Sequence, residues 1–363
     1  MSERATERAT DLTGEDEPAG RRGDRRPKWL KTAGLTLAGL LVLGAGAAGW
    51  VYWHLSDNIT SVDINSALGD DRPPKSVSTP AVSPSTSASP VPVPSGALNI
   101  LVLGSDSRSG EENAELGGGD DSGGARSDTA MVVHLDEGRT TATVVSIPRD
   151  TLVTRPSCPL SSGGSTEVAY RAMFNSAYAV GGPVCAVKTA ESLTGVRMDH
   201  YLEIDFSGFA NLVDALGGVT VTTDEDIDDE DSHLELAAGT HHLDGEQALA
   251  LARTRHGIGD GSDLGRITLQ QQLVKALLDQ IASTNLLTSP TNLYEVADAV
   301  TAGLTTDTEL DSLTELVSLG RSLADLTSDR VETVTMPVVT APSDPNRVVA
   351  DEPEATELWE SLR

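Results

Sequence analysis

Five arginine residues stand where helices or strands of this chain are expected to meet loops. They are Arg126, Arg149, Arg253, Arg255 and Arg266. A guanidinium group stays charged and presents a planar fork of donors that matches a phosphate, whereas Lys occurs at only five positions in the chain. The pattern favours a phosphate-binding site. Two alternatives stay open, because Arg149 could pair with Asp150 at the surface and Arg253 and Arg255 could complement the dipole at the end of a helix.

Two aspartates, Asp106 and Asp128, each stand beside an expected strand. Asp106 follows the apolar run at residues 99–103, and Asp128 precedes a second strand. Mg²⁺ usually takes one or two carboxylates together with phosphate oxygens and water. A site for Mg²⁺ (or Mn²⁺) is therefore one interpretation, and ordinary turn or cap residues are the other.

A polar stripe runs along the helix expected at residues 263–283. Asp263, Arg266 and Gln270 are spaced i, i+3 and i+7, so they share one helix face beside an apolar stripe. The stripe is either part of a site or a solvated face. The chain has no Gly-x-Ser-x-Gly elbow and no phosphate loop ending in Gly-Lys-Ser/Thr, and its histidines form no metal-binding motif. These observations argue against a serine hydrolase and a nucleotide hydrolase.

The elements that must position these side chains indicate an α/β layer domain. The continuous apolar run 99–103 predicts a strand buried on both faces at the centre of a sheet. Strands and helices interleave along the chain, which predicts a three-layer helix–sheet–helix arrangement around a central mixed β-sheet. The other strands are expected at residues 130–135, 141–147, 201–205, 219–222 and 331–338. The helices are expected at residues 166–180, 183–194, 209–216, 245–254, 263–283, 291–303, 309–323 and 354–362.

A membrane anchor is expected at residues 32–53, which are 22 residues without Asp, Glu, Lys or Arg. As a helix this run would be about 33 Å long, enough to cross the hydrocarbon core of a bilayer. The basic tail at residues 1–31 precedes it, so the positive-inside rule predicts a cytoplasmic N-terminus, single-pass insertion in the cell membrane and an extracytoplasmic remainder. A signal peptide cleaved near Ala47 is the alternative, but the apolar run continues through Val51.

Beyond the anchor, composition predicts a linker followed by one globular domain. Residues 54–72 are predicted to form a polar stem, and residues 73–96, rich in Pro and Ser, a semi-rigid extended segment. The linker therefore spans 54–96 and the globular domain 97–363. The Gly- and Asp-rich residues 110–124 are expected to be a mobile loop.

The charge and the cysteine content limit which binding partners and which cellular compartment are compatible with this chain. The chain has 26 basic and 55 acidic residues, of which 8 and 7 lie in residues 1–31, so the remainder carries a net charge of −30. Such a domain does not bind nucleic acid through its overall charge. Outside the cytoplasm, Cys158 and Cys185 are expected to form a disulfide; in the cytosol they would be inert thiols.

Taken together, the motifs resemble the LytR-CpsA-Psr family. They occur in the family's order over about residues 98–285, and the ordered set is far more specific than any one motif. The matching segments are Leu103-Gly-Ser-Asp-Ser-Arg108, Arg126-Ser-Asp-Thr129, Ser146-Ile-Pro-Arg-Asp150, Phe174-Asn175 to Tyr178 with Gly181-Gly182, Asp199-His-Tyr201, Leu216-Gly-Gly-Val219, Leu243-Asp-Gly-Glu-Gln-Ala-Leu249, Arg253-Thr-Arg255, Gly259-Asp260, and Asp263-Leu-Gly-Arg266 before Gln270-Gln271.

The resemblance implies a phosphotransferase that moves a glycopolymer from a polyprenyl-pyrophosphate carrier to a cell-wall acceptor, either peptidoglycan or a surface protein, with pyrophosphatase activity as a side reaction. It implies that Asp106 and Asp128 hold Mg²⁺ on the pyrophosphate. It implies that Asp263 positions its neighbours or acts as a base. The residues implied to bind the pyrophosphate are Arg126, Arg149, Arg253, Arg255, Arg266 and Gln270.

This chain departs from the family pattern at one position. The family often carries an Arg directly before the Gln pair, where this chain has Leu269, so one phosphate contact is missing from the pattern.

The first alternative function is that of a non-catalytic binder of polyprenyl-linked or anionic wall polymers. A regulator of envelope gene expression ranks last, because a tail of about 30 residues holds no DNA-binding fold. A disulfide between Cys158 and Cys185 would brace a wall of the site.

Overall fold

The computed structural model describes residues 46, 49–75, 96–105, 127–255, 263–284, 289–324 and 326–363, without the side chains of Asp128 and Pro290. The chain divides into residues 1–51 and 52–363. The second unit holds the fold described below. Within the described ranges, no helix is both long and apolar enough to cross a bilayer. Most of the predicted anchor, the loop 110–124 and residues 76–95 of the predicted linker lie outside those ranges.

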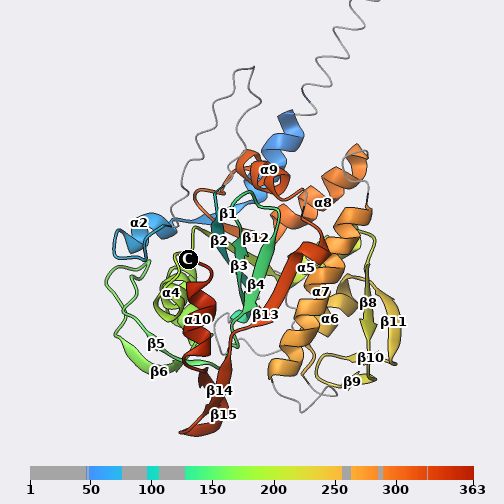
Figure 1. Ribbon diagram of the computed structural model, residues 1–363. Coiled ribbons are helices and arrows are strands. Elements are labelled where there is room, and N and C mark those ends of the chain that lie inside the picture. The colour runs from blue at the N-terminus through green and yellow to red at the C-terminus, as the bar shows by residue number, and fades with distance from the viewer. Residues whose placement is uncertain are drawn as a thin grey trace, which may run out of the picture. The chain divides into compact units, whose positions relative to one another are not determined.

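A seven-stranded mixed sheet forms the centre of the fold, with strand order β1-β12-β7-β2-β3-β4-β13 (Figure 1). The apolar strand β2 pairs in parallel with β7 and antiparallel with β3, as expected of a strand in the middle of a sheet. The prediction of an α/β fold with a central mixed sheet is confirmed. The strands are β1 (Thr60–Val62), β2 (Leu98–Ser105), β3 (Ser127–Leu135), β4 (Ala142–Ser146), β7 (His200–Asp205), β12 (Leu304–Asp307) and β13 (Val331–Thr335).

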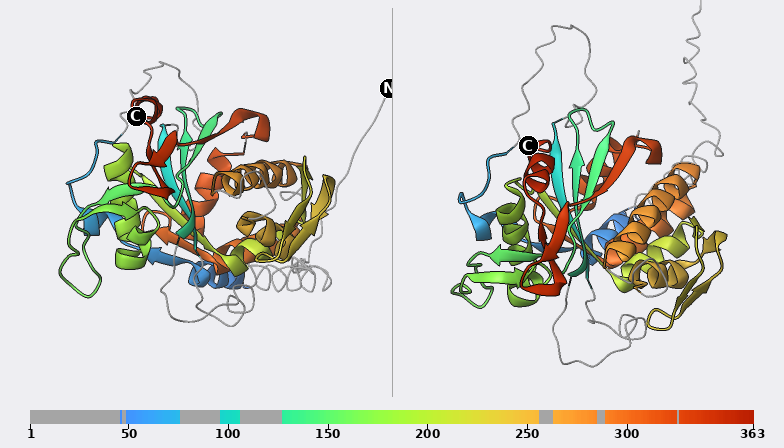
Figure 2. Two further views of the ribbon diagram at one scale, coloured as in Figure 1. Left: turned by 90° about the horizontal axis from the view of Figure 1, so that it is seen from below. Right: turned by 60° about the horizontal axis from the view of Figure 1, so that its bottom comes forward.

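Helices lie on both sides of this sheet (Figure 2). They begin and end largely where capping residues stand; Asp244, for example, forms a capping box with Gln247 at the start of α6. The helices are α2 (Ile64–Leu68), α4 (Ser176–Thr194), α5 (Phe206–Ala215), α6 (Gly245–Arg253), α7 (Asp263–Ser283), α8 (Pro290–Ala302), α9 (Leu313–Ser322) and α10 (Glu354–Glu360), with a 3₁₀ turn, η2 (Ser328–Arg330).

The two faces of the sheet can be told apart by the alternation of side chains along β2. Leu101 and Leu103 are fully buried in one cluster with residues of α4 and α10, including Trp359. Ile100 and Val102 belong to another cluster, together with residues of α7 and α9. We call the first side the packed face and the second the cavity face, for the cavity described below.

Four two-stranded sheets surround the central one, and the sequence predicted few of their strands. Their strands are short, and their pairing depends on contacts that no local pattern reveals. They pair β5 (Leu152–Arg155) with β6 (Ala169–Met173), β8 (Val219–Thr223) with β11 (Gly239–Leu243), β9 (Ile227–Asp229) with β10 (Leu234–Leu236), and β14 (Val338–Ala341) with β15 (Asp344–Ala350).

The prediction of a helix at residues 166–180 is wrong for the first half of that range. Residues 169–173 form strand β6, because they pair antiparallel with β5, and the helix begins only at Ser176. A kink at Gly181 and Gly182 then separates the two halves of α4, where a helix end was predicted. Gly182 has a φ of 62°, a conformation that favours glycine.

The polar stem predicted at residues 54–72 is also corrected. Leu55, Ile64 and Leu68 are buried, and β1 pairs with β12 at the edge of the central sheet. Arg72 forms a buried ion pair with Glu191 of α4, with 2.6 Å between Nη2 and Oε1. In the sequence, three apolar residues dispersed among polar ones were too weak a pattern to predict that this segment belongs to the fold. Tertiary contacts order it.

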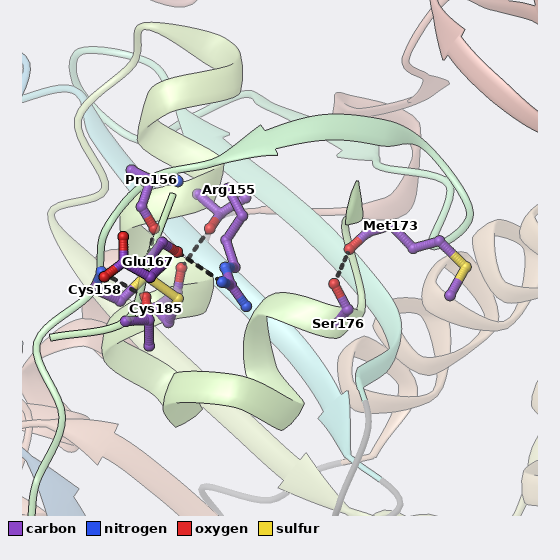
Figure 3. Close-up of a disulfide and its surroundings, with 9 residues drawn as sticks. Arg155, Pro156, Cys158, Glu167, Met173, Ser176 and Cys185 are labelled. Atoms are coloured by element: carbon purple, nitrogen blue, oxygen red, sulfur yellow. Dashed lines mark hydrogen bonds between the residues drawn. A yellow bond between two sulfur atoms is a disulfide. The ribbon is translucent and has the colours of Figure 1, made fainter. Parts of the chain in front are cut away.

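Cys158 and Cys185 form the predicted disulfide (Figure 3). It joins the segment after β5 to the second half of α4, next to Ala177. Near it, Arg155 Nη2 donates a hydrogen bond of 2.8 Å to the carbonyl oxygen of Glu167. Both cysteines are fully buried, so this covalent link lies inside the layer that covers the packed face.

Candidate active site

A cavity of about 420 Å³ lies on the cavity face, between the sheet and helices α5, α6 and α7. Its lining changes character along α7: Arg266 and Gln270 come first, and Leu273, Val274 and Leu277 follow. From Arg266 to Leu277 the helix rises by about 16 Å. The apolar lining also includes Val102, Met131, Ile204, Phe209 and Leu249, and the polar lining includes Thr129, Asp205, Asp231, Ser232, Arg253 and Arg255.

Asp263, Arg149 and Arg266 form one charged cluster at the polar end of α7. Arg149 Nε lies 3.3 Å from Asp263 Oδ1, and Arg266 Nη2 pairs with the same oxygen. Asp150, the surface partner considered from the sequence, is farther from Arg149, at 3.9 Å, and also lies 3.6 Å from Arg347 Nη1. Asp263 stands in the first turn of α7, where a negative charge complements the helix dipole. One carboxylate thus orders two of the predicted phosphate-binding arginines.

Arg253 and Arg255 reach the cavity from the end of α6. Thr254, between them, is the C-cap of α6 and has extended backbone geometry. The guanidinium carbon of Arg253 lies 4.9 Å from the ring centroid of Phe206, a cation–π arrangement that orients the side chain. Both arginines line the cavity together with Arg266. The structure therefore brings together residues that are up to 13 positions apart in sequence.

Gln270 holds the cavity wall together. Its Nε2 atom donates to Thr129 Oγ1 of β3 and to the carbonyl oxygen of Ala252, each at 2.9 Å. Both amide hydrogens are thus engaged by the protein, which favours a positioning role over the direct phosphate contact implied by the resemblance. Leu269 is buried in a hydrophobic cluster with Val213 and Leu273. Leu269 faces that cluster and is not part of the cavity lining. The replacement of the family's Arg by Leu at this position therefore affects packing.

Three predicted site residues cannot be placed with the others. Asp106 and Arg126 lie outside the described residues, and Asp128 belongs to β3 but its side chain is not described. Ser105, the residue before Asp106, pairs with Ser127, the residue before Asp128. The strand ends that lead to both predicted metal ligands therefore meet at one edge of the sheet.

Asp229, Asp231 and Ser232 are functional candidates that the sequence did not single out. Asp231 and Ser232 line the cavity, and Asp229 is buried beside them. Asp229 and Asp231 belong to an acidic run from Asp224 to Asp231, with Ser232 directly after it, and such a run is typical of solvated surface. Only their partners distinguish them from the exposed acidic residues around them.

At the opposite end of β7, His200, Asp307 and Glu309 form the one group of possible metal ligands within the described part of the chain. Asp307 already accepts hydrogen bonds from His200 at 3.1 Å, from the amide of Tyr201 at 2.9 Å and from the amide of Glu309 at 2.8 Å. Burial opposes ionisation of Asp307, but these hydrogen bonds outweigh it and lower its pKa. Within this group, the hydrogen bond between His200 and Asp307 joins β7 to β12.

The disulfide does not brace the wall of this site as the sequence suggested. Cys158 and Cys185 are not among the residues that line the cavity, and they pack with Ala177 of α4. Their contribution is to the layer over the packed face.

The fold is an α/β fold, and its cavity is apolar along α7 with Arg253, Arg255 and Arg266 in the lining. The sequence profile of the LytR_cpsA_psr family matches residues 51–363. The chain belongs to this LytR-CpsA-Psr family, as the ordered motifs predicted.

Several characterised relatives are similar over much of this chain. The probable cell wall biosynthesis protein LcpB of Corynebacterium glutamicum is 35% identical over 272 residues, which are 73% of this chain and 61% of that protein. Cell wall biosynthesis protein LcpA of the same species is 33% identical over 67% of this chain and 50% of its own length. This chain thus spans half to three fifths of those two relatives. The polyisoprenyl-teichoic acid–peptidoglycan teichoic acid transferase TagU of Bacillus mycoides is 32% identical over 70% of this chain and 72% of that protein.

Solved structures share the fold. The crystal structure of Bacillus subtilis TagV matches with a TM-score of 0.57 and 26% identity, over 74% of this chain and 96% of that one. A structure of TagT bound to LI-WTA matches with a TM-score of 0.54 and 26% identity, over 74% of this chain and 89% of that one.

Proposed function

We propose that this protein is a phosphotransferase that moves a glycopolymer from a polyprenyl-pyrophosphate carrier to a cell-wall acceptor. The observation that carries the proposal is the cavity of about 420 Å³ that is apolar along α7 and has Arg253, Arg255 and Arg266 in its lining. Polyprenyl pyrophosphate has the same two parts, an apolar chain and a doubly charged head. In a domain with so large an excess of acidic residues, an anionic ligand needs such a local group of arginines to overcome the overall negative charge.

The polyprenyl chain would lie along the apolar part of α7, beside Val274 and Leu277. Each methylene removed from water there contributes about 0.8 kcal/mol to binding. The pyrophosphate would then reach the arginines at the first turns of the helix. Because Arg149 and Arg266 share Asp263, their guanidinium groups are held in place before the ligand arrives.

Phosphoryl transfer needs positioning and charge neutralisation more than covalent help from the protein. The acceptor hydroxyl oxygen would attack the phosphorus next to the glycan, and its proton would pass to a phosphate oxygen of the departing polyprenyl monophosphate. The bond from that phosphorus to the bridging oxygen would break, and polyprenyl monophosphate would leave. Arg149, Arg253, Arg255 and Arg266 would stabilise the charge that develops on the phosphate oxygens. Asp263, engaged by two guanidinium groups, suits a positioning role better than that of a base.

A divalent metal belongs to this proposal as an expectation. Mg²⁺, or Mn²⁺, when bound, would neutralise charge on the pyrophosphate. Asp106 and Asp128 are the residues that would hold it, which is consistent with the pairing of Ser105 with Ser127. Carboxylates beside a phosphate site are the donors that this hard cation prefers.

The partners and the location complete the proposal. The names of TagU and TagV describe transfer of teichoic acid from a polyisoprenyl carrier to peptidoglycan, which supports peptidoglycan as the acceptor; a surface protein is the second candidate acceptor. A lipid-linked donor lives in the membrane. The predicted anchor at residues 32–53 would keep the domain outside the cytoplasm and next to that donor.

The test uses the full chain in lipid vesicles with a polyprenyl-pyrophosphate-linked glycan, an acceptor glycan and Mg²⁺. We expect acceptor-dependent release of polyprenyl monophosphate. Arg149→Ala and Arg255→Ala should each lower kcat/KM by roughly 100-fold, because each removes a charge from the transition state. Arg330→Ala, at an exposed arginine of η2, is the matched control and should keep the wild-type rate.

Two outcomes would contradict parts of the proposal. If both site variants keep the wild-type rate, the site has been assigned wrongly. If lipid co-purifies with the protein but no product forms with Mg²⁺ or Mn²⁺, the protein is a non-catalytic binder.

A further inference from the structure

The hairpin of β9 and β10 lies outside the central sheet, yet it buries one of its carboxylates. Asp229, the last residue of β9, is 2% exposed, whereas its neighbour Asp228 is exposed. Ile227 and Leu234 anchor the hairpin in a hydrophobic cluster with Leu251 of α6. A buried carboxylate is costly unless hydrogen bonds replace its lost water, so the partners of Asp229 are informative.

Asp229 accepts hydrogen bonds both from its own turn and from the arginine segment. Its Oδ1 atom accepts from the amides of Asp231 at 2.9 Å and Ser232 at 3.3 Å, which is a common local turn arrangement. Its Oδ2 atom accepts from the amide of Arg255 at 2.6 Å, across 26 residues of chain. The second contact serves no local turn, because it joins the hairpin to the segment that carries Arg253 and Arg255.

A second bridge runs parallel to the first. Ser232 Oγ and Thr254 Oγ1 are 3.0 Å apart, and Thr254 is 1% exposed. Thr254 leaves α6 with an extended backbone, so the helix itself does not determine the direction of the next residue. The hairpin therefore holds both Thr254 and Arg255 at the point where the chain departs from the helix.

We propose that Asp229 is a positioning residue for Arg255, with Ser232 as its auxiliary. This inference rests on the proposed function, in which Arg255 binds the pyrophosphate. Asp231 and Ser232 line the same cavity as Arg255, so the hairpin and the arginine form one wall. A free loop would let the Arg255 guanidinium sample many directions, and each ligand would have to order it. The bond from the Arg255 amide to Asp229 fixes the backbone from which this side chain extends, so part of that ordering is present before the ligand arrives.

The test compares Asp229→Asn with Asp228→Asn in the full chain in detergent micelles. The Asn side chain keeps one acceptor oxygen and replaces the other by a donor, so it cannot serve both the turn and the Arg255 amide. The probe is geranylgeranyl pyrophosphate. We expect its Kd to rise roughly ten-fold in Asp229→Asn, since a hydrogen bond to a charged acceptor is lost. In Asp228→Asn it should stay within about two-fold of wild type.

A double-mutant cycle separates positioning from general damage. If Asp229 acts through Arg255, Asp229→Asn should weaken binding no further in an Arg255→Ala background. In an Arg149→Ala background it should still cost the full ten-fold, because Arg149 belongs to the separate cluster around Asp263. Additive losses with Arg255→Ala, or a wild-type Kd for Asp229→Asn, would overturn the inference.

Two further measurements keep the result interpretable. If Asp229→Asn does not fold, Ser232→Ala removes only the bridge to Thr254 and should raise the Kd about two- to three-fold, again only when Arg255 is present. An unchanged Kd for Ser232→Ala in that case would refute the inference. If the wild-type protein itself neither binds the probe nor transfers glycan, the proposed function fails rather than the role of Asp229.

Discussion

The two faces of the central sheet are built by the same strands but are filled to different degrees. On the packed face, Leu101 and Leu103 of β2 meet α4 and α10 with no exposed area. On the cavity face, Val102 of the same strand borders a space of about 420 Å³. Protein interiors are normally close-packed, and an empty apolar space forfeits dispersion contacts. The packed face therefore supplies more stability, and the cavity face lacks some of the dispersion contacts that a filled interior would have.

The buried polar groups differ in the same way. On the packed face, Glu203 accepts hydrogen bonds of 2.5 Å from both Tyr178 and Tyr201, so its charge is satisfied internally. Burial, followed by the nearby Glu203 carboxylate, raises the pKa of Tyr201 well above its usual value. On the cavity face, arginines gather around a space where a ligand can lie. The first arrangement holds the fold together, and the second prepares a site.

The largest expected effect is on the packed face. Trp359→Ala should lower the free energy of unfolding by about 3–5 kcal/mol, because Trp359 is 2% exposed and its removal leaves a large hole. Leu277→Ala, at a half-buried position that already borders the cavity, should cost only about 1 kcal/mol. Urea titration of both variants measures the difference. Equal losses would mean that the two faces are equally packed.

Removal of the disulfide should lower stability without affecting the cavity. The bridge closes a loop with a sequence separation of 27 residues, for which chain entropy predicts a loss of about 3 kcal/mol in a Cys158→Ser/Cys185→Ser variant. The two cysteines do not line the cavity, so the Kd for geranylgeranyl pyrophosphate should stay at the wild-type value below the melting temperature. A weaker Kd in the folded variant would show that the two faces are coupled.

Two neighbouring residues of β2 provide a matched pair. Leu101→Phe adds volume to the packed face and should cost about 1–3 kcal/mol of stability with little change in the Kd for the probe. Val102→Phe adds volume to the cavity and should change stability by less than about 1 kcal/mol, but weaken binding of the polyprenyl chain. Thermal unfolding and probe titration distinguish the two outcomes. The reverse pattern would contradict the assignment of the faces.

The smallest expected effect concerns pH. Burial lowers the pKa of His134, and the opposing charges of Asp136 and Asp199 do not compensate. The unfolded chain binds this proton near pH 6.5 and the folded chain only at lower pH, so stability from this group is present above pH 6.5 and lost as pH falls. The free energy of unfolding should therefore decrease between pH 7 and pH 5.

His134→Gln should flatten this part of the pH profile, measured as the free energy of unfolding in urea. The Nδ1 atom of His134 lies 2.7 Å from Asn99 Oδ1, so Gln can retain part of that contact. A variant with the same pH slope as the wild type would assign the dependence to other groups.

Prediction from sequence was most reliable where one local pattern carried the information. The apolar run at 99–103 became β2, and the helix expected at 263–283 matches α7. Prediction was least reliable for short strands, whose formation depends on a pairing partner. Residues 169–173 look helical by composition but form β6, because strand β5 offers them a partner. Pairing partners are distant in sequence, so no local pattern predicts them.

The candidate site shows the same division. The sequence pointed to four arginines as candidates, because a guanidinium group at the end of a helix or strand is a recognisable chemical signal. They are Arg149, Arg253, Arg255 and Arg266. Asp229 was not a candidate, since it is one of several acidic residues in a single run. Its burial and its bond to the Arg255 amide exist only after the hairpin folds against α6.

The sequence by itself determined the fold class and the family and proposed the arginines of the candidate site, because hydrophobic period and ordered motifs are local or cumulative properties of the chain. Only the tertiary structure decided that the cavity lies on one face of the sheet, that Gln270 bonds to the protein, and that residues 54–72 belong to the fold. Each of these depends on contacts between distant segments, whose free energy is gained only when the whole domain assembles.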